Sequence, residues 1–292
     1  MSVSQIFSQF CNNLKVDNKD TISYRYKQIT KRLNQDFWGT ESDVDHSLYG
    51  GSYGRGTAIN FVSDIDMYFV LPYKYYVQYS NYQGNGQSAL LQAVKNSISK
   101  TYSTTKLRGD GQVVIVEFSD GVIFEVVPVF INKDGVTYTY PDANNGGSWK
   151  VTKFKMEIDA INEMNKKCNG NLKELCKMVR AWRNNVNLKM GGLLIDTLCY
   201  NFIMNWEYKD KSYTYYDWLS RDFFKYLSNQ NPDQEYWLAP GSNQYVWKKE
   251  NFIYKAKQAY NIAKEACECH SNNKDEDAKE LWREIYGSKF PN

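Results

Sequence analysis

The segment Ser63-Asp64-Ile65-Asp66-Met67 restricts the possible fold of this chain more than any other part of its sequence. The apolar run that follows it predicts a strand. Residues two apart on a strand project from the same face, so Asp64 and Asp66 point together while Ile65 and Met67 can point into a core. Two adjacent carboxylates repel each other unless a cation lies between them, and Mg²⁺ prefers such oxygen ligands. The pattern therefore predicts a strand end that holds a divalent metal.

A glycine-rich turn, Gly51-Ser52-Tyr53-Gly54-Arg55-Gly56-Thr57, precedes this strand. Backbone N–H groups freed by the glycines, with a following helix N-terminus, suit the binding of phosphate, and Ser52 adds a hydroxyl donor. Ser52 lies 12 positions before Asp64, which leaves room for a short helix and a turn that bring both sites to one end of a sheet. A Walker P-loop is excluded because no Gly-Lys-Ser/Thr follows at its spacing. A dinucleotide-binding fingerprint is excluded because no strand leads into a GxGxxG helix turn.

Many sites that transfer nucleotidyl groups need a third carboxylate, and there are two candidates, Glu117 and Glu125. They flank a hairpin turn predicted at Asp120-Gly121. A two-residue turn there pairs Glu117 with Phe124, which places the two glutamates on opposite faces, so only one can join the aspartates. Glu125 lies in the otherwise uncharged run from Val122 to Ile131, where a carboxylate needs a metal or a cation. We therefore expect Glu125 at the metal site; the alternative is a buried ion pair with a lysine or arginine.

Helix and sheet alternate in the first half of the chain, and helices fill the second. Apolar residues at three-to-four spacing predict one long helix within the first 37 residues. Beyond the loop at residues 140–149 no strand is predicted. The clearest helix of the second half runs from about Leu172 to Val186, with one apolar stripe for packing. Its other stripe, which contains Lys177 and Arg180, can face a ligand.

Composition excludes several classes of protein. With 42% hydrophobic and 24% charged residues, the 292-residue chain is ordinary for a folded globular protein. No apolar run approaches the roughly 18 residues of a membrane span, and the first residues lack a signal-peptide pattern, so we expect a cytoplasmic protein without membrane contact. A formal charge of +3 does not by itself indicate nucleic-acid binding. The six cysteines are scattered, which favours reduced thiols.

These motifs resemble a known family. The Gly-Ser turn, the Asp-Ile-Asp strand and the lone carboxylate in Val-Ile-Phe-Glu-Val-Val-Pro-Val-Phe are similar to the polymerase-beta-type nucleotidyltransferase superfamily. The glycine-rich turn, Val-Arg-Ala-Trp-Arg at 179–183 and Gly-Leu-Leu-Ile-Asp-Thr-Leu at 192–198 resemble the bacterial cGAS/DncV-like nucleotidyltransferases. The resemblance covers essentially the whole chain. It implies an α+β protein of two lobes with a central cleft. Residues 1–150 would form a nucleotidyltransferase core with a mixed sheet and a long N-terminal helix. Residues 151–292 would form a helical lobe like the C-terminal part of oligoadenylate synthetases.

The resemblance also implies an activity. The enzyme would condense ribonucleoside triphosphates, ATP and others not specified by the sequence, into a cyclic di- or trinucleotide second messenger and release pyrophosphate. The setting it implies is bacterial antiphage (CBASS) signalling, in which a downstream effector binds the product.

The resemblance assigns roles to particular residues. The catalytic and metal-binding residues would be Asp64, Asp66 and Glu125, holding two Mg²⁺ ions for which Mn²⁺ can substitute. The nucleotide-binding residues would be Gly51, Ser52, Lys177, Arg180 and Asp196. Gly51 and Ser52 would bind the triphosphate, and Lys177 or Arg180 would neutralise it. Asp196 either accepts a hydrogen bond from an exocyclic base amine or is a surface or capping carboxylate.

Two other functions stay open on the same fold. One is another polymerase-beta-type activity, such as RNA tailing or nucleotidylation of a small molecule. The other is a catalytically silent nucleotide or RNA sensor, although such proteins tend to lose metal carboxylates and this chain retains three candidates. Animal relatives carry a zinc-ribbon insertion with His and Cys ligands, which this sequence lacks, so activation by DNA is not expected.

Overall fold

The structure of the chain is a computed structural model that describes residues 1–60 and 64–292. Ser63, the first residue of the predicted aspartate motif, lies outside these residues. The chain divides into two compact units, each assembled from separate stretches of sequence. The helical unit comprises Met1–Val16, Arg55–Asn60 and Glu157–Asn292, and the sheet unit comprises Asp17–Gly54 and Phe61–Met156. A division into two domains at residue 150 stays a prediction.

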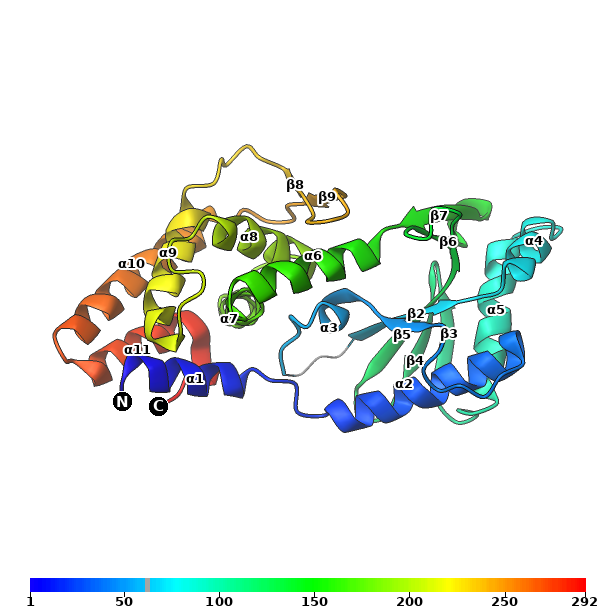
Figure 1. Cartoon of the computed structure of the whole chain (residues 1–292), viewed down its shortest axis with the longest axis horizontal. Coiled ribbons are helices and arrows are strands. Elements are labelled where there is room, and N and C mark those ends of the chain that lie inside the picture. The colour runs from blue at the N-terminus through cyan, green and yellow to red at the C-terminus, as the bar shows by residue number, and fades with distance from the viewer. Residues whose placement is uncertain (61–63) are drawn as a thin grey trace. The chain divides into compact units, whose positions relative to one another are not determined.

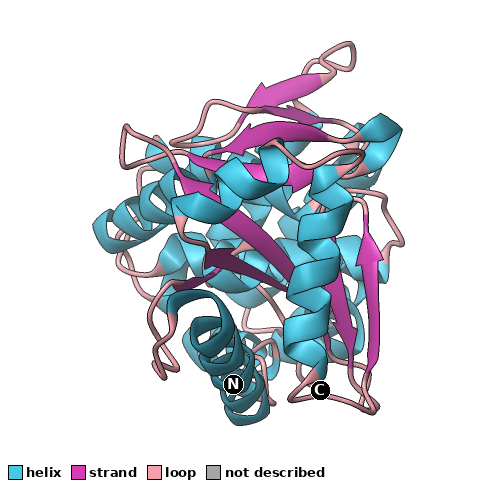
Figure 2. Cartoon of the chain, turned by 90° about the vertical axis from the view of Figure 1, so that its right-hand side faces the viewer, coloured by secondary structure: helices cyan, strands magenta, loops and turns pink. Residues whose placement is uncertain are grey.

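The sheet unit is built on a seven-stranded mixed sheet with helices packed against it (Figures 1 and 2). Its strands are β1 (Ser47–Tyr49), β2 (Asp64–Val70), β3 (Lys106–Asp110), β4 (Val113–Glu117), β5 (Ile123–Ile131), β6 (Tyr138–Asp142) and β7 (Ser148–Thr152). Its helices are α2 (Lys19–Leu33), a π-helical turn (Asn34–Trp38), α3 (Gly51–Gly54), α4 (Tyr73–Ser80), α5 (Gly86–Ser99) and a 3-10 turn (Asn144–Gly146). The central order is β1-β2-β5-β4-β3, in which β2 and β5 run parallel and the other neighbours antiparallel. The α+β prediction is confirmed.

Buried apolar residues alternate with more exposed residues along β2, so the two faces of the strand differ. Ile65, Met67 and Phe69 are buried, and α2 and α5 cover this side of the sheet with their own apolar residues. Burying each such side chain contributes roughly 1.5–3 kcal/mol to folding. Asp64 and Asp66 alternate with these residues and therefore project from the opposite face, as predicted.

The hairpin between β4 and β5 exists where it was predicted, but its register differs by one residue. The Phe118 N–H donates to the Val122 carbonyl (3.0 Å) and the Gly121 N–H to the Phe118 carbonyl (3.0 Å). The loop thus has three residues and ends on Gly121 at φ +87°, a geometry that inserts one residue more than a two-residue turn. Glu117 consequently pairs with Ile123. The prediction that Glu117 and Glu125 lie on opposite faces is therefore wrong.

The helical unit packs around one aromatic-rich core. Its helices are α1 (Val3–Asn13), α6 (Phe154–Lys167, which begins in the sheet unit), α7 (Asn171–Asn185), α8 (Gly192–Met204), α9 (Tyr216–Ser228), α10 (Ile253–Ser271) and α11 (Asp275–Tyr286), with 3-10 turns at Tyr213–Tyr215 and Gly287–Lys289. A small hairpin of β8 (Tyr236–Leu238) and β9 (Tyr245–Trp247) completes the unit. The helix predicted at about Leu172 to Val186 is confirmed as α7.

Two expectations about secondary structure are wrong. The long helix predicted within the first 37 residues is two helices, α1 and α2, separated at residues 14–18. Phe7 of α1 packs against Trp282 in the helical unit, whereas α2 packs on β2 in the sheet unit, so the two helices belong to different units. Strands also occur beyond residue 140, where none was predicted; β7, β8 and β9 have only three to five residues each.

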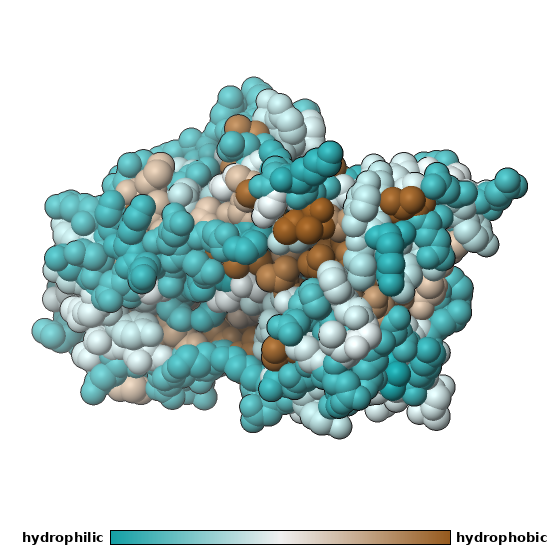
Figure 3. Space-filling view, turned by 45° about the vertical axis from the view of Figure 1, so that its right-hand side comes forward, coloured by the Kyte–Doolittle hydropathy of each residue, from teal (hydrophilic) through white to brown (hydrophobic). Residues whose placement is uncertain are grey.

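Within residues 1–60 and 64–292, no helix combines the length and apolar character needed to cross a membrane. The face of the molecule in Figure 3 is mostly hydrophilic, with a few hydrophobic patches.

Candidate active site

The parallel pairing of β2 and β5 brings the predicted carboxylates together. Asp66 lies directly opposite Glu125, and Asp64 lies opposite Ile123, two residues earlier on β5. Neighbouring strands are about 4.8 Å apart, and residues in register share a face. Asp64, Asp66 and Glu125 therefore form one group on the face that α2 and α5 leave uncovered.

The environment of Glu125 shows that these charges interact. The side chain is half-buried, and its pKa is raised, first by burial and then by the negative charges of Asp66 and Asp64. Asp110 adds to the rise, whereas Arg108 opposes it. A carboxyl group in this position favours a proton or a cation over a free negative charge.

The donor set fits a hard divalent cation, although the side chains are not gathered around one point. All three groups offer carboxylate oxygens, the ligands that Mg²⁺ prefers. In the described part of the chain, no three His, Cys, Asp or Glu side chains converge into a preformed metal-binding group.

The glycine-rich turn lies against Asp66. The Gly50 N–H donates to the Asp66 carbonyl (2.8 Å), and the chain then enters the one-turn helix α3 at Gly51. Gly51 has a φ of +52°, and a Cβ built on it would collide with the Asp66 carboxylate. Only glycine satisfies both conditions. The predicted phosphate-binding turn and the predicted metal-binding strand are thus neighbours, with Ser52 one residue further on.

Register and pairing distinguish Glu125 from Glu117. Both glutamates project from the same face, but Glu117 is on β4, one strand farther from β2, and its carboxylate pairs with Lys106 of β3 (2.6 Å). That pairing lowers the pKa of Glu117. Glu125 alone is the direct neighbour of Asp66. Its role as a metal ligand stays a prediction.

Arg180 and Asp196 lie in the interior of the helical unit. The Arg180 guanidinium donates to both Asp196 oxygens, Nη1 to Oδ1 at 2.6 Å and Nη2 to Oδ2 at 3.0 Å. Arg55 Nε (2.8 Å) and Thr57 Oγ1 (3.0 Å) also donate to Asp196 Oδ2. Burial by itself would raise the pKa of Asp196, but Arg180 and Arg55 lower it to about 2.

A fully buried carboxylate with four donors is neither a surface nor a simple capping group, so that alternative for Asp196 is wrong. The Arg180 guanidinium donates hydrogen bonds to Asp196 and to the backbone carbonyls of Cys176 and Gly192. Asp196 of α8 thus joins Arg55 and Thr57 to Arg180 of α7. Direct contact of Asp196 or Arg180 with a nucleotide stays a prediction.

Lys177 is the most accessible of the predicted residues on α7. Its amino group pairs with Glu174 one turn earlier (2.8 Å), and both side chains are mostly buried. Lys173, also on α7, donates to Asn162 (2.6 Å), and its pKa is lowered by burial and by the charge of Lys177. Contact of Lys177 with phosphate stays a prediction.

The comparison with known families decides what this fold is. Residues 1–165 match the SMODS family, the Second Messenger Oligonucleotide or Dinucleotide Synthetase domain. The match spans more than half of the chain. The chain belongs to the SMODS family. All three carboxylates and the glycine-rich turn lie inside the matched region.

The SMODS chain is similar over most of its length to two curated proteins. A Bacillus cereus (strain VD146) protein named "Probable cyclic nucleotide synthase" is 22% identical over 282 residues, covering 82% of this chain and 81% of that protein. "Cyclic AMP-AMP-AMP synthase" from Acinetobacter sp. (strain ATCC 27244 / 9458) is 25% identical over 264 residues, covering 84% of this chain and 73% of that protein.

Among solved structures, the apo form of Vibrio cholerae DncV matches with a TM-score of 0.65 and 15% identity, covering 84% of this chain and 69% of DncV. At this identity the likeness shows the fold. Together with the family match, it confirms the prediction of a bacterial cGAS/DncV-like nucleotidyltransferase. The chain is an enzyme of this class, and cyclic oligonucleotide synthesis is the activity that its family and curated relatives support.

Sequence reasoning missed three residues of this SMODS protein. Arg55 and Thr57 sit inside the glycine-rich motif but were given no role, and Glu157 of α6 was not considered. Arg55 lies 3.8 Å from Glu157, which also accepts hydrogen bonds from Ser242 and Gln244. The available signal was an arginine between two glycines, where a charge at a tight turn needs a partner.

Proposed function

We propose that this SMODS protein condenses ribonucleoside triphosphates, ATP among them, into a cyclic di- or trinucleotide second messenger and releases pyrophosphate. One observation carries the proposal: β2 pairs with β5 so that Asp66 lies beside Glu125, while Gly51 lies against the Asp66 carboxylate. A carboxylate group suited to metal thus adjoins a turn suited to phosphate. The Acinetobacter relative is named for a cyclic trinucleotide, and a DncV structure is titled cyclic AMP-GMP synthase, so both ring sizes occur among similar proteins.

The turn would bind the triphosphate through its backbone. The positive φ of Gly51 redirects the chain beside Asp66, and backbone N–H groups in such a turn can converge on an anion. The Ser52 hydroxyl would add a donor. Because α3 is a single turn, the individual N–H groups and the hydroxyl carry this argument, and a helix dipole does not.

Asp64, Asp66 and Glu125 would hold the divalent cations, two Mg²⁺ ions by expectation. When bound, these ions would lower the pKa of the acceptor ribose hydroxyl and stabilise charge on the transferring phosphoryl group. The carboxylates themselves fix the position of the reacting groups from a rigid pair of strands. The raised pKa of Glu125 makes cation binding a competition with protons.

Cyclic products require at least two transfers at one site, the second of which closes the ring. One DncV structure holds a linear intermediate, 5' pppA(3',5')pG, and another holds 3'-deoxy ATP. We infer the same order of events for this chain, with a linear intermediate retained until closure. We propose that such a product acts in antiphage CBASS signalling through an effector that binds it.

The test is to incubate the purified protein with the four ribonucleoside triphosphates and Mg²⁺ or Mn²⁺, then treat with phosphatase and analyse by mass spectrometry. A phosphatase-resistant product whose mass matches a ring supports the proposal, and the variant carrying both Asp64→Asn and Asp66→Asn should fold but make none. Replacing ATP with 3'-deoxy ATP tests whether a 3' hydroxyl is the acceptor. Phosphatase-sensitive linear oligomers would instead assign a tailing activity, and full turnover by the double variant would remove the site assignment.

A further inference from the structure

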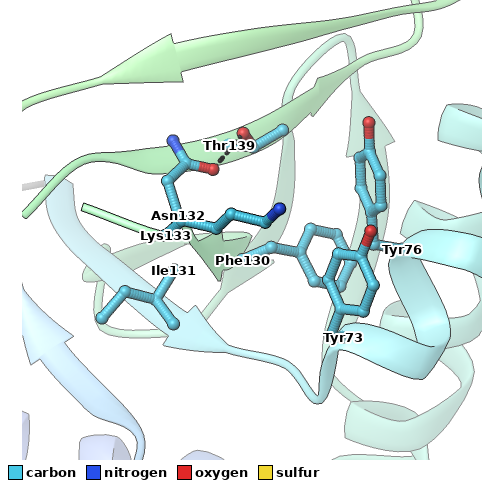
Figure 4. A pocket seen from close by; sticks show the side chains of 7 residues that line it. All are labelled: Tyr73, Tyr76, Phe130, Ile131, Asn132, Lys133 and Thr139. Carbon is cyan, nitrogen blue, oxygen red and sulfur yellow. Dashed lines mark hydrogen bonds between the residues drawn. The ribbon is translucent and has the colours of Figure 1, made fainter. Parts of the chain in front are cut away.

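A concave site lies in the sheet unit, away from the carboxylates. It is a cavity of about 440 Å³, within the size range of small-molecule sites, lined by Tyr73, Tyr76, Phe130, Ile131, Asn132, Lys133 and Thr139 (Figure 4). The β5 residues that line it lie at the end of that strand, five and six residues beyond Glu125, or about 17–20 Å along the strand. The cavity is thus separate from the candidate active site.

The walls of the cavity are aromatic and fixed by one another. Tyr73 and Tyr76 of α4 stack at 5.5 Å between ring centroids, and Tyr76 meets Phe130 edge-on, also at 5.5 Å. Trp149 supports both Tyr76 (5.0 Å) and Phe130 (5.7 Å) from behind. Phe130 is 2% exposed whereas Tyr73 is 68% exposed, so the cluster is anchored on one side and open on the other. Such rings offer faces and edges on which a flat ligand can stack.

The polar groups of the cavity are few and of definite sign. Asn132 is held in place because its amide donates to Thr137 (2.8 Å) and its carbonyl oxygen accepts from Thr139 (2.8 Å), which leaves one amide N–H for a ligand. Lys133 extends across the cavity toward the aromatic rings (Figure 4). Among residues 1–60 and 64–292 it makes no ion pair. Its neighbour Asp134 already accepts three hydrogen bonds from Val136 and Thr137.

We propose that this cavity is a binding site for a small planar aromatic anion, whose ring stacks on Tyr73 and Tyr76 and whose negative group pairs with Lys133. A cationic ligand would meet an uncompensated ammonium group, and an aliphatic one would not use the ring faces. Two sources share this chemistry, a nucleotide and an aromatic carboxylate. The proposal concerns a site outside the nucleotidyl-transfer chemistry and does not depend on it.

The test measures binding of three probes to the full-length protein in EDTA, by calorimetry. The probes are 2-naphthoate, its neutral analogue 2-naphthamide, and AMP. We expect 2-naphthoate to bind once per chain and roughly three- to tenfold more tightly than the amide, the range of one charge-assisted contact near a surface. Lys133→Met should remove that preference, and Tyr73→Ala should weaken both naphthyl probes.

Lys74→Met is the matched control. Like Lys133, Lys74 is exposed, but it belongs to α4 and lies over the Tyr75 ring (5.1 Å), outside the cavity. The Lys74→Met variant should bind as the unmodified protein does. If AMP shows the same dependence on Lys133, the site serves nucleotides; if only 2-naphthoate does, it serves aromatic carboxylates. Absence of binding, equal binding of acid and amide, or equal effects of the two lysine variants would overturn the proposal.

Discussion

Replacing Asp196 with asparagine separates the structural role that the fold gives this residue from the base-recognition role considered on sequence grounds. Asp196 is fully buried, and it receives hydrogen bonds from Arg180, Arg55 and Thr57. Asparagine has nearly the same shape but no charge, and its amide nitrogen cannot accept. The variant therefore leaves the buried guanidinium groups of Arg180 and Arg55 without the negative charge of Asp196. Arg55 keeps Glu157, whose carboxylate lies 3.8 Å away.

Two independent arguments give the magnitude. Removing one partner of a buried ion pair typically costs about 3–5 kcal/mol, because the other charge stays buried. The pKa of Asp196, lowered from its usual 3.8 to about 2, corresponds to roughly 2–3 kcal/mol of stabilisation by the charged form, at about 1.4 kcal/mol per pKa unit. We expect the asparagine variant to lose about 3 kcal/mol in the free energy of unfolding.

Urea unfolding followed by tryptophan fluorescence measures this loss. With a slope near 2–3 kcal/mol per molar urea, a 3 kcal/mol loss moves the midpoint of the helical unit's transition by about 1 M. Asp210→Asn is the control, since Asp210 is exposed in the same unit and its carboxylate pairs with Lys211 at 3.7 Å. The control should leave the midpoint unchanged.

The pH dependence gives a second check with a definite sign. A carboxyl whose pKa is lowered by folding adds stability that is complete above its unfolded pKa near 4 and is lost as the pH falls toward about 2. The gap between the unmodified protein and Asp196→Asn should therefore narrow from pH 5 to pH 2. An unchanged urea midpoint together with an altered choice of nucleotide base would refute this reasoning and support base recognition by Asp196.

Three further predictions concern the sheet unit. Gly51→Ala should abolish turnover and destabilise the protein more than Gly39→Ala does. Both positions have a positive φ, which penalises alanine by roughly 1–2 kcal/mol, but only at Gly51 would the added Cβ meet the Asp66 carboxylate. Melting temperatures and product yields of the two variants test this. Glu125→Gln should lower kcat by at least about 100-fold. Glu117→Gln should keep its turnover, because Glu117 lies on the same face but pairs with Lys106. Equal losses of kcat in the two variants would contradict the assignment of Glu125 to the metal site. Burial and two neighbouring aspartates raise the pKa of Glu125, so activity should fall with acidity at a pH above the ordinary glutamate range. This fall should move to lower pH as the Mg²⁺ concentration is raised, because the cation competes with the proton. A pH–rate profile that does not respond to Mg²⁺ would contradict this competition.

The features that sequence predicted well are those whose signal is local and long enough to repeat. Helix α7, predicted at about Leu172 to Val186, spans 15 residues, so its apolar spacing recurs over about four turns. The Asp-Ile-Asp strand needs only period-two alternation to place both aspartates on one face. In contrast, β8 and β9 have three residues each, too few for alternation to be distinguished from chance.

The buried network of the helical unit could not be predicted because it depends on contacts between distant parts of the chain. Arg55 and Asp196 are separated by 141 positions, and nothing near Asp196 in the sequence indicates that a turn from the first quarter of the protein supplies its partner. Charged residues on an amphipathic helix such as α7 are usually solvated, so Arg180 was expected to face a ligand. Its complete burial follows from tertiary packing that brings Asp196 onto the same side.

The prediction of the third carboxylate included one incorrect step. The step that only one glutamate can join the aspartates assumed a two-residue turn and hence opposite faces, whereas Glu125 was preferred for its uncharged surroundings. The three-residue loop ending at Gly121 shifts the register by one, and a one-residue shift reverses the face of every partner. The two glutamates are on one face, so face cannot choose between them. What distinguishes them is strand order: β5 is the parallel neighbour of β2, and β4 is one strand removed. The nearly uncharged composition of β5 reflects that central position, because a strand with a neighbour on both sides and one covered face buries most of its residues.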